Sequence, residues 1–119
     1  KSQLKRSGFC LVLHMILYNV TVSIDPSVHD EWVAYMREKH IPEVIESGCF
    51  LEARFCRVNG EEEGGVTYAT TYLCSSQEMY DHYNSNHAAE LRKEFNERWA
   101  GKFAAFRTFL NVVEEFKAK

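Results

Sequence analysis

The sequence of 119 residues lacks the short motifs that would tie it to a known reaction. It has no glycine-rich phosphate loop, no HExxH pair, no EF-hand spacing and no serine or cysteine nucleophile motif. It also lacks an excess of positive charge, with 14 Lys and Arg against 17 Asp and Glu and a net charge of −3. This balance argues against nucleic acids and anionic membranes as partners, because proteins that bind them carry basic surfaces.

Paired cysteine motifs are missing as well. The four cysteines form no CxxC, and no Cys/His spacing is typical of a zinc site, so we predict no metal. Isolated cysteines on apolar strands are usually small buried hydrophobic residues, which favours a reducing, cytoplasmic compartment. A disulfide between Cys49 and Cys74 is the minor alternative, should these two residues prove to be neighbours.

The sequence has no apolar run long enough to cross a bilayer. Basic residues precede the run FCLVLHMIL near the N-terminus, which raises the question of a signal peptide, but no small-residue cleavage site follows it. We expect Met15 to be the natural start and residues 1–14 to be an upstream or added extension. Residues 15–116 then form one α+β domain, and residues 117–119 form a frayed tail.

Strands and turns are present in a regular order. Ile16 to Ile24 alternates apolar and polar residues, as a strand with one buried face does. Three further strands are predicted over residues 49–58, 66–74 and 102–113. Asn59-Gly60 and Gly64-Gly65 frame a hairpin turn between the second and third strands, and we expect the three glutamates between them to be solvated.

Two helices separate these strands. The first is predicted from Pro26 to Ile45, capped by Asp25, with a kink or short break at 40–42 caused by Pro42. Its apolar stripe includes residues at steps of four, namely Trp32, Met36, His40 and Val44. The second helix begins at the capping-box pattern Ser75-Ser76-Gln77-Glu78 and ends at Gly101, with a break before His87 where Asn86 caps the second half.

The resulting order, β-α-β-β-α-β, predicts a ferredoxin-like fold, with a four-stranded antiparallel sheet and both helices on one face. The other face is left open. From the alternation we expect this open face to carry a mixed set of aromatic, apolar and polar side chains: Leu17, Asn19, Thr21, Glu52, Arg54, Cys56, Tyr68, Thr70, Tyr72, Arg107 and Phe109. Such a face would suit a second sheet or a ligand.

With its element order and the segments MILYNVTV, HIPEV and FRTFLNVVEEF, the chain resembles an uncharacterised bacterial family, a domain of unknown function, over residues 15–116. This family of short proteins lies in the dimeric α/β-barrel superfamily. The resemblance implies a homodimer in which two open sheet faces close into a barrel. It implies no activity, and no catalytic set of the monooxygenases, haem-degrading enzymes or isomerases in that superfamily matches residues here.

His40 is the candidate catalytic residue, because it lies where the first helix is expected to break and could act as an acid or base. The competing explanation, which we favour, is that its ring bonds a backbone carbonyl freed by Pro42. His87 has the same two readings, as a ligand-binding residue or as a structural one at a helix start. His82 lies five residues before His87, so the two do not share a helix face well and a metal pair is not expected.

Arg54 and Arg107 are candidate ligands for an anion or carboxylate, or alternatively partners in ion pairs. Tyr68 and Tyr72 could donate hydroxyl groups to a ligand but are equally good strand residues. These residues lead to the hypothesis of a homodimer that binds a small aromatic or anionic molecule in the barrel between its two sheets. A cofactor-free monooxygenase or isomerase and a protein-interaction module are the alternatives, and the sequence leaves the identity of any cofactor unknown.

Overall fold

A computed structural model describes residues 14–60 and 64–119. The expected N-terminal extension lies outside the described residues except for His14, and so does the glutamate tip of the hairpin turn. The extension and the tip therefore remain predictions.

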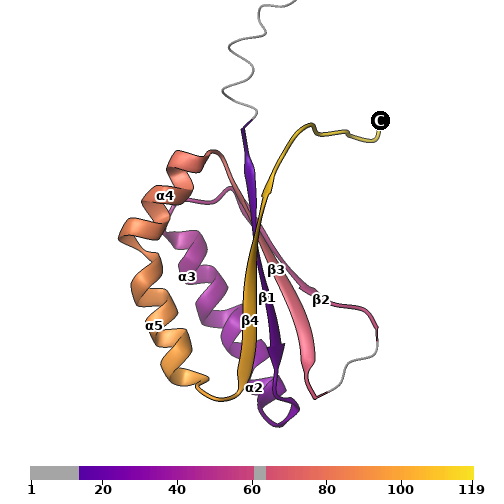
Figure 1. The fold of residues 1–119 in the computed structure, drawn as a ribbon, viewed down its shortest axis with the longest axis vertical. Helices are drawn as coiled ribbons and strands as arrows, with labels where there is room; N and C mark the ends of the chain where they lie inside the picture. The colour runs from indigo at the N-terminus through magenta and orange to yellow at the C-terminus, as the bar shows by residue number, and fades with distance from the viewer. Residues whose placement is uncertain (1–13, 61–63) are drawn as a thin grey trace, which may run out of the picture.

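The molecule has two layers, a layer of helices and one antiparallel sheet, which stand side by side in Figure 1. The strand order is β2-β3-β1-β4. The strands are β1 (Ile16–Ile24), β2 (Glu52–Arg57), β3 (Val66–Cys74) and β4 (Phe103–Asn111). Both helical connections cross the same face of the sheet, which confirms the predicted α+β, ferredoxin-like fold.

The first connection is one continuous helical path with a widened turn. It runs through η1 (Pro26–Val28), α2 (His29–Tyr35), the π-helical turn η2 (Met36–His40) and α3 (Ile41–Glu46). The predicted break is absent, because His40 and Ile41 both keep right-handed helical dihedrals. Instead the Ile41 amide bonds the Met36 carbonyl five residues back, so the disturbance before Pro42 takes the form of a π turn.

The second connection contains the predicted break. It consists of α4 (Gln77–Asn86) and α5 (Ala88–Arg98), which meet at His87. Ser76 Oγ accepts a hydrogen bond from the Met79 amide and caps α4. The predicted cap of α5 by Asn86 is wrong, because the Asn86 side-chain amide Nδ2 donates backwards to the His82 carbonyl and leaves α5 without a side-chain cap.

Strand β1 turns its predicted apolar side towards the helices, where Ile16, Tyr18, Val22 and Ile24 are buried. Strand β3 is the first exception to the predicted faces. Tyr18 pairs with Tyr72 and Val22 with Tyr68, so the β3 tyrosines and Thr70 face the helices as well. Their placement on the open face was wrong, because a strand of Thr and Tyr has no clear apolar side.

Strand β4 is also turned the other way from the prediction. Arg107 pairs with Val20 and Phe109 with Tyr18, which puts both side chains on the helix-covered side. Phe106 and Leu110 face outward instead and are 63% and 46% exposed. Phenylalanines at positions 103, 106 and 109 give a period of three, which fits neither face of a strand.

The core between helices and sheet is divided into two clusters of buried side chains. The first surrounds Tyr18, Tyr72 and Phe50, under α4 and the end of α3. The second surrounds Trp32 and Ile24, under α2 and α5. At the centre of the sheet the helix-facing pair is Val20 and Thr70, which are smaller than the tyrosines beside them, so the middle of the core is filled less completely.

Among the described residues Cys49, Cys56 and Cys74 are free thiols. The Cys74 Sγ donates to the Cys49 carbonyl at 3.3 Å, so these two residues are neighbours without a disulfide. No described helix has the length and apolar character needed to cross a membrane.

The assignment of Tyr72 to the core can be tested directly. Tyr72→Ala should lower the free energy of unfolding by about 3–5 kcal/mol, because it removes a buried aromatic ring. Thr71→Ala changes the next residue, on the opposite face, and should cost roughly 0.5 kcal/mol or less. Urea denaturation followed by circular dichroism measures both, and equal losses would contradict the assignment.

Candidate functional site

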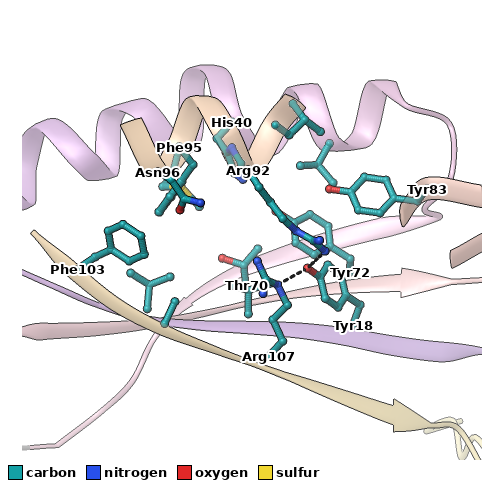
Figure 2. A pocket seen from close by; sticks show the side chains of 16 residues that line it. Tyr18, His40, Thr70, Tyr72, Tyr83, Arg92, Phe95, Asn96, Phe103 and Arg107 are labelled. Atoms are coloured by element: carbon teal, nitrogen blue, oxygen red, sulfur yellow. Dashed lines mark hydrogen bonds between the residues drawn. The ribbon is translucent and has the colours of Figure 1, made fainter. Parts of the chain in front are cut away.

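A cavity of about 70 Å³ lies at the junction of the two core clusters, between the sheet and the helices (Figure 2). Val20 and Thr70 form part of its floor, and Phe95 and Phe103 line its apolar end. Further lining residues come from β1, β3, β4, the first helical path, α4 and α5: Tyr18, Val22, Met36, His40, Val44, Tyr72, Tyr83, Leu91, Arg92, Asn96, Ala105 and Arg107. The cavity is therefore on the helix side of the sheet, away from the open face where the sequence placed a ligand.

Two guanidinium groups meet at one phenol oxygen at the polar end of this cavity. Arg107 Nε donates to Tyr18 Oη at 2.9 Å, and Arg92 Nη2 donates to the same oxygen at 3.3 Å. Arg92 reaches down from α5 and Arg107 comes up from β4, as Figure 2 shows. Arg92 also donates to Tyr80 Oη and to Asn84 Oδ1, both at 3.3 Å.

The charge of these two arginines has no counter-ion within the described part of the chain. Neither guanidinium forms an ion pair with a described carboxylate, and no described Asp or Glu lines the cavity. Their shared partner is a neutral phenol, which accepts hydrogen bonds without neutralising positive charge. Two cations around one small space favour an anion there.

His40 projects from the π turn towards the same space (Figure 2). Its ring stacks on Tyr35 with centroids 5.8 Å apart and lies 5.3 Å from the Phe95 ring. Its Nδ1 is buried without a hydrogen-bond partner among the described residues, so the ring is not tied through this atom to a carbonyl freed by Pro42. Burial lowers the pKa of His40 to about 4, against the opposing effect of Glu43 and Glu94, so the imidazole is neutral at pH 7.

Two of the phenols that line the cavity, those of Tyr72 and Tyr83, are held in their neutral form. Burial raises the pKa of Tyr72 and of Tyr83, and the nearby Tyr18 phenol raises both further. A neutral phenol can donate a hydrogen bond to an anion, and the Tyr83 hydroxyl points into the cavity in Figure 2. The walls thus offer donors at one end and aromatic carbon at the other.

The structure brings together only some of the residues singled out in the sequence. His40, Tyr72 and Arg107 line the cavity. Tyr68 lies outside its lining, where its hydroxyl is 2.7 Å from His29 Nε2. Arg54 is on the open face and lies 4.0 Å from Glu52, in the local ion pair considered as its alternative role.

His87 also lies away from the cavity. Its ring is 5.7 Å from that of His82 and 6.3 Å from that of Tyr83. The two histidines were not expected to share a helix face, but α4 ends at Asn86 and the break turns His87 towards His82.

Arg92, Tyr18 and Thr70 are cavity residues that the sequence did not assign to a site. The position of Arg92 in the sequence could have identified it, through its spacing from apolar residues of α5. It lies four residues after the fully buried Ala88 and three before the buried Phe95, which places an arginine on the inward edge of α5. No sequence pattern could have identified Thr70, because its placement depended on which face of β3 is turned towards the helices.

The model of the family described as Domain of unknown function (DUF4286) matches residues 15–113. The chain belongs to this family. The family expected from the sequence is thereby confirmed, and the family carries no assigned activity. No functionally curated protein matches the chain in sequence.

Several solved structures share the fold of this family member. A dimeric ferredoxin-like protein from an uncultured marine organism matches with a TM-score of 0.68 and 11% identity, covering 87% of this chain and 99% of that one. An EthD-like protein from Ralstonia eutropha matches with a TM-score of 0.63 and 19% identity, covering 87% and 96%. A Streptomyces coelicolor monooxygenase in complex with nanaomycin D matches with a TM-score of 0.62 and 15% identity, covering 99% and 100%. At these identities the similarity establishes the fold.

His40 should make folding stability depend on pH. The unfolded chain protonates this residue near its ordinary pKa of 6.5, whereas the folded chain resists protonation until about pH 4. Protonation between these values therefore favours unfolding, and the free energy of unfolding should fall by roughly 3 kcal/mol as pH drops from 6.5 to 4. Above pH 6.5 this contribution is complete.

His40→Phe keeps an aromatic ring beside Tyr35 and Phe95 and removes the titration. Urea unfolding of both proteins at several pH values between 4 and 7 gives the difference between their free energies of unfolding. The contributions of the carboxylates, which both proteins share, cancel in this difference. A wild-type curve parallel to that of the variant would show that His40 is not held neutral by burial.

Proposed function

We propose that this protein binds a small carboxylate-bearing molecule in the cavity of each subunit, and that it does so as a homodimer. The observation that carries the first part is the pair of guanidinium groups, Arg92 and Arg107, that share the Tyr18 phenol without a described counter-ion. A carboxylate between them would accept charge-assisted hydrogen bonds, which are shorter and stronger than those of a neutral phenol. In the chain without ligand, Tyr18 accepts a hydrogen bond from each of the two cations.

The size of the cavity limits the ligand. A volume of about 70 Å³ is roughly half that of an apolar cavity of ~150 Å³ that holds benzene. A carboxylate with a short chain therefore fits with little rearrangement. An aromatic acid would require movement at the rim, where Asn96 of α5 and Ala105 of β4 are exposed.

The homodimer is supported by the open face of the sheet. This face carries Leu17, Leu73, Phe106 and Leu110 on three neighbouring strands, and two of them are largely exposed in the single chain. Apolar patches of this kind mark contact surfaces on soluble proteins. A twofold axis would place the same surface on both partners, and one structural neighbour is described as a dimeric ferredoxin-like protein.

A second candidate is a cofactor-free monooxygenase, the alternative named from the sequence, and the monooxygenase from Streptomyces coelicolor supports it by similarity of fold alone. The observation that favours it is the unpartnered Nδ1 of His40 beside the cavity. Because the pKa of His40 is about 4, its neutral ring can accept a hydrogen bond from a hydroxyl group but is a weak base for full proton transfer. This makes it a better positioning group than a base at neutral pH, so we place binding first.

Carboxylate binding predicts a dependence on charge. Propionate and benzoate should bind measurably more tightly than propanol and benzyl alcohol, which have similar carbon frames without the negative charge. Arg92→Gln should weaken carboxylate binding by roughly 10- to 150-fold, because a hydrogen bond to a charged group contributes about 1.5–3 kcal/mol. Chemical-shift titration of the ¹⁵N-labelled protein measures the dissociation constants.

Arg54→Gln is the matched control, since Arg54 lies on the opposite face of the sheet, where it is 4.0 Å from Glu52. It should leave the dissociation constants unchanged. Equal binding of acids and alcohols, or equal losses in the two arginine variants, would overturn the assignment of the cavity to carboxylates.

The homodimer predicts a change in mass when charge is added to the open face. Phe106→Glu should shift the protein from dimer to monomer in sedimentation experiments at micromolar concentration, because it puts a carboxylate in an apolar contact. Ala89→Glu adds the same charge on the exposed side of α5 and should remain dimeric. A wild-type protein that sediments as a monomer would contradict the proposal.

A further inference from the structure

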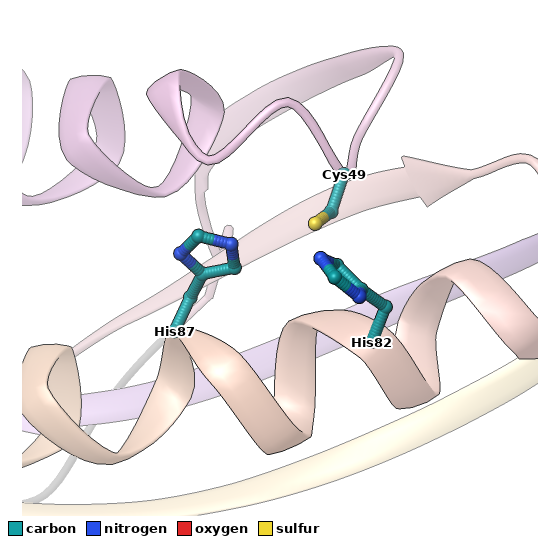
Figure 3. A group of neighbouring side chains, drawn as sticks. All are labelled: Cys49, His82 and His87. Atoms are coloured by element: carbon teal, nitrogen blue, oxygen red, sulfur yellow. The ribbon is translucent and has the colours of Figure 1, made fainter.

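Three side chains that commonly bind metals converge at the end of the molecule remote from the apolar end of the cavity. They are Cys49 in the loop after α3, His82 in α4 and His87 at the break between α4 and α5. Figure 3 shows the thiol and the two imidazoles facing a common space. One ligand atom from each of the three lies within 4.8 Å of the other two.

The backbone holds Cys49 in this position. Gly48 takes a φ of 78° at the end of α3, a left-handed conformation that favours glycine and turns the chain towards α4. The Cys49 amide then donates to Ser47 Oγ at 3.3 Å, and its carbonyl accepts from Cys74 Sγ. The Cys49 residue is only 3% exposed, and within the described part of the chain its thiol forms one long hydrogen bond, at 3.7 Å to the Ser47 carbonyl.

The helix break positions the two imidazoles. His87 leaves the helical dihedrals at φ −128°, while its amide still bonds the Tyr83 carbonyl, and its ring stacks on Tyr83. The His82 ring is held by a hydrogen bond at Nδ1, which lies 3.1 Å from the side-chain nitrogen Nδ2 of Asn86. Nε2 is therefore the nitrogen of His82 left to bind a ligand.

These atoms are close to the spacing that zinc requires. With Zn–S near 2.3 Å and Zn–N near 2.0–2.1 Å, the ligand atoms of a tetrahedral site are about 3.5 Å apart. The three groups would have to approach by roughly 1 Å, which rotation of the exposed His82 side chain can supply. One thiolate with two imidazoles is a set that suits zinc and leaves its fourth position open.

We propose that Cys49, His82 and His87 bind a zinc ion, independently of the cavity and of its proposed ligand. Binding replaces the thiol proton and takes Nε2 of His82, so the His82 ring proton moves to Nδ1. The Asn86 side-chain amide would then keep its hydrogen bond to the His82 carbonyl and release Nδ1, whose proton is donated to water. A hollow beside the site is lined by Glu78 and Met79, so the fourth position is open to water or to the Glu78 carboxylate.

Cobalt(II) provides the test, because a thiolate bound to cobalt gives a charge-transfer band in the near ultraviolet and tetrahedral cobalt gives strong visible bands. The full chain, reduced, free of metal and without an affinity tag, should bind one cobalt ion, and zinc should displace it. Cys49→Ser should abolish the charge-transfer band. His82→Gln and His87→Gln should each weaken zinc binding by roughly tenfold or more.

Three variants control for adventitious binding. Cys10→Ser and Cys56→Ser change other thiols, His29→Gln changes a histidine outside the cluster, and all three should bind zinc as the wild type does. His82→Gln alters an exposed side chain and keeps the test informative if Cys49→Ser fails to fold. The proposal is overturned if the control variants lose binding as the cluster variants do, if the wild type gives no charge-transfer band, or if copper binds and zinc does not.

Discussion

The hydrogen bonds that Arg92 and Arg107 donate to the Tyr18 phenol tie the two layers of this molecule together at its centre. Through one oxygen they connect the central strand β1 with the helix α5 and the edge strand β4, whose arginines lie 74 and 89 residues further along the chain. Because the phenol is neutral, the junction keeps both positive charges uncompensated by any described carboxylate. The cavity beside it exists because Val20 and Thr70 leave the middle of the sheet thinly covered, and the two arginines give that space its chemical character.

The division of the sheet into two different faces follows from the same centre. The helix-covered face carries the cavity with its cations, phenols and aromatic rings, whereas the open face carries the apolar side chains of Phe106 and Leu110. In the proposed function, ligand binding and dimer contact therefore use opposite sides of one sheet. A substitution at one surface can be made without touching the other, which a ligand held between two sheets would not allow.

Sequence patterns predicted the fold because its decisive signals are local. Strand β1 alternates cleanly, Ser76 caps a helix at its start, and the helix break before His87 follows a run of residues that form helices poorly. The faces of β3 and β4 could not be predicted in the same way. Thr and Tyr suit either side of a strand, and three phenylalanines at a period of three point in both directions. Pairing with β1 decides these faces, and pairing depends on residues 42 to 95 positions away in the chain.

The π turn from Met36 to His40 also explains the spacing of the first helical path. Residues at steps of four in an α-helix advance by about 400°, so a stripe of four such residues drifts about 120° around the axis. In a π turn each residue rotates the chain by a smaller angle than in an α-helix, which cancels part of that drift. This lets Trp32, Met36 and Val44 all be buried and His40 face the cavity between them. The strict spacing of four residues in this segment therefore fits a helix that contains one extra residue in its π turn. Deleting one residue from that turn would restore a regular α-helix and rotate the His40 side chain away from the sheet.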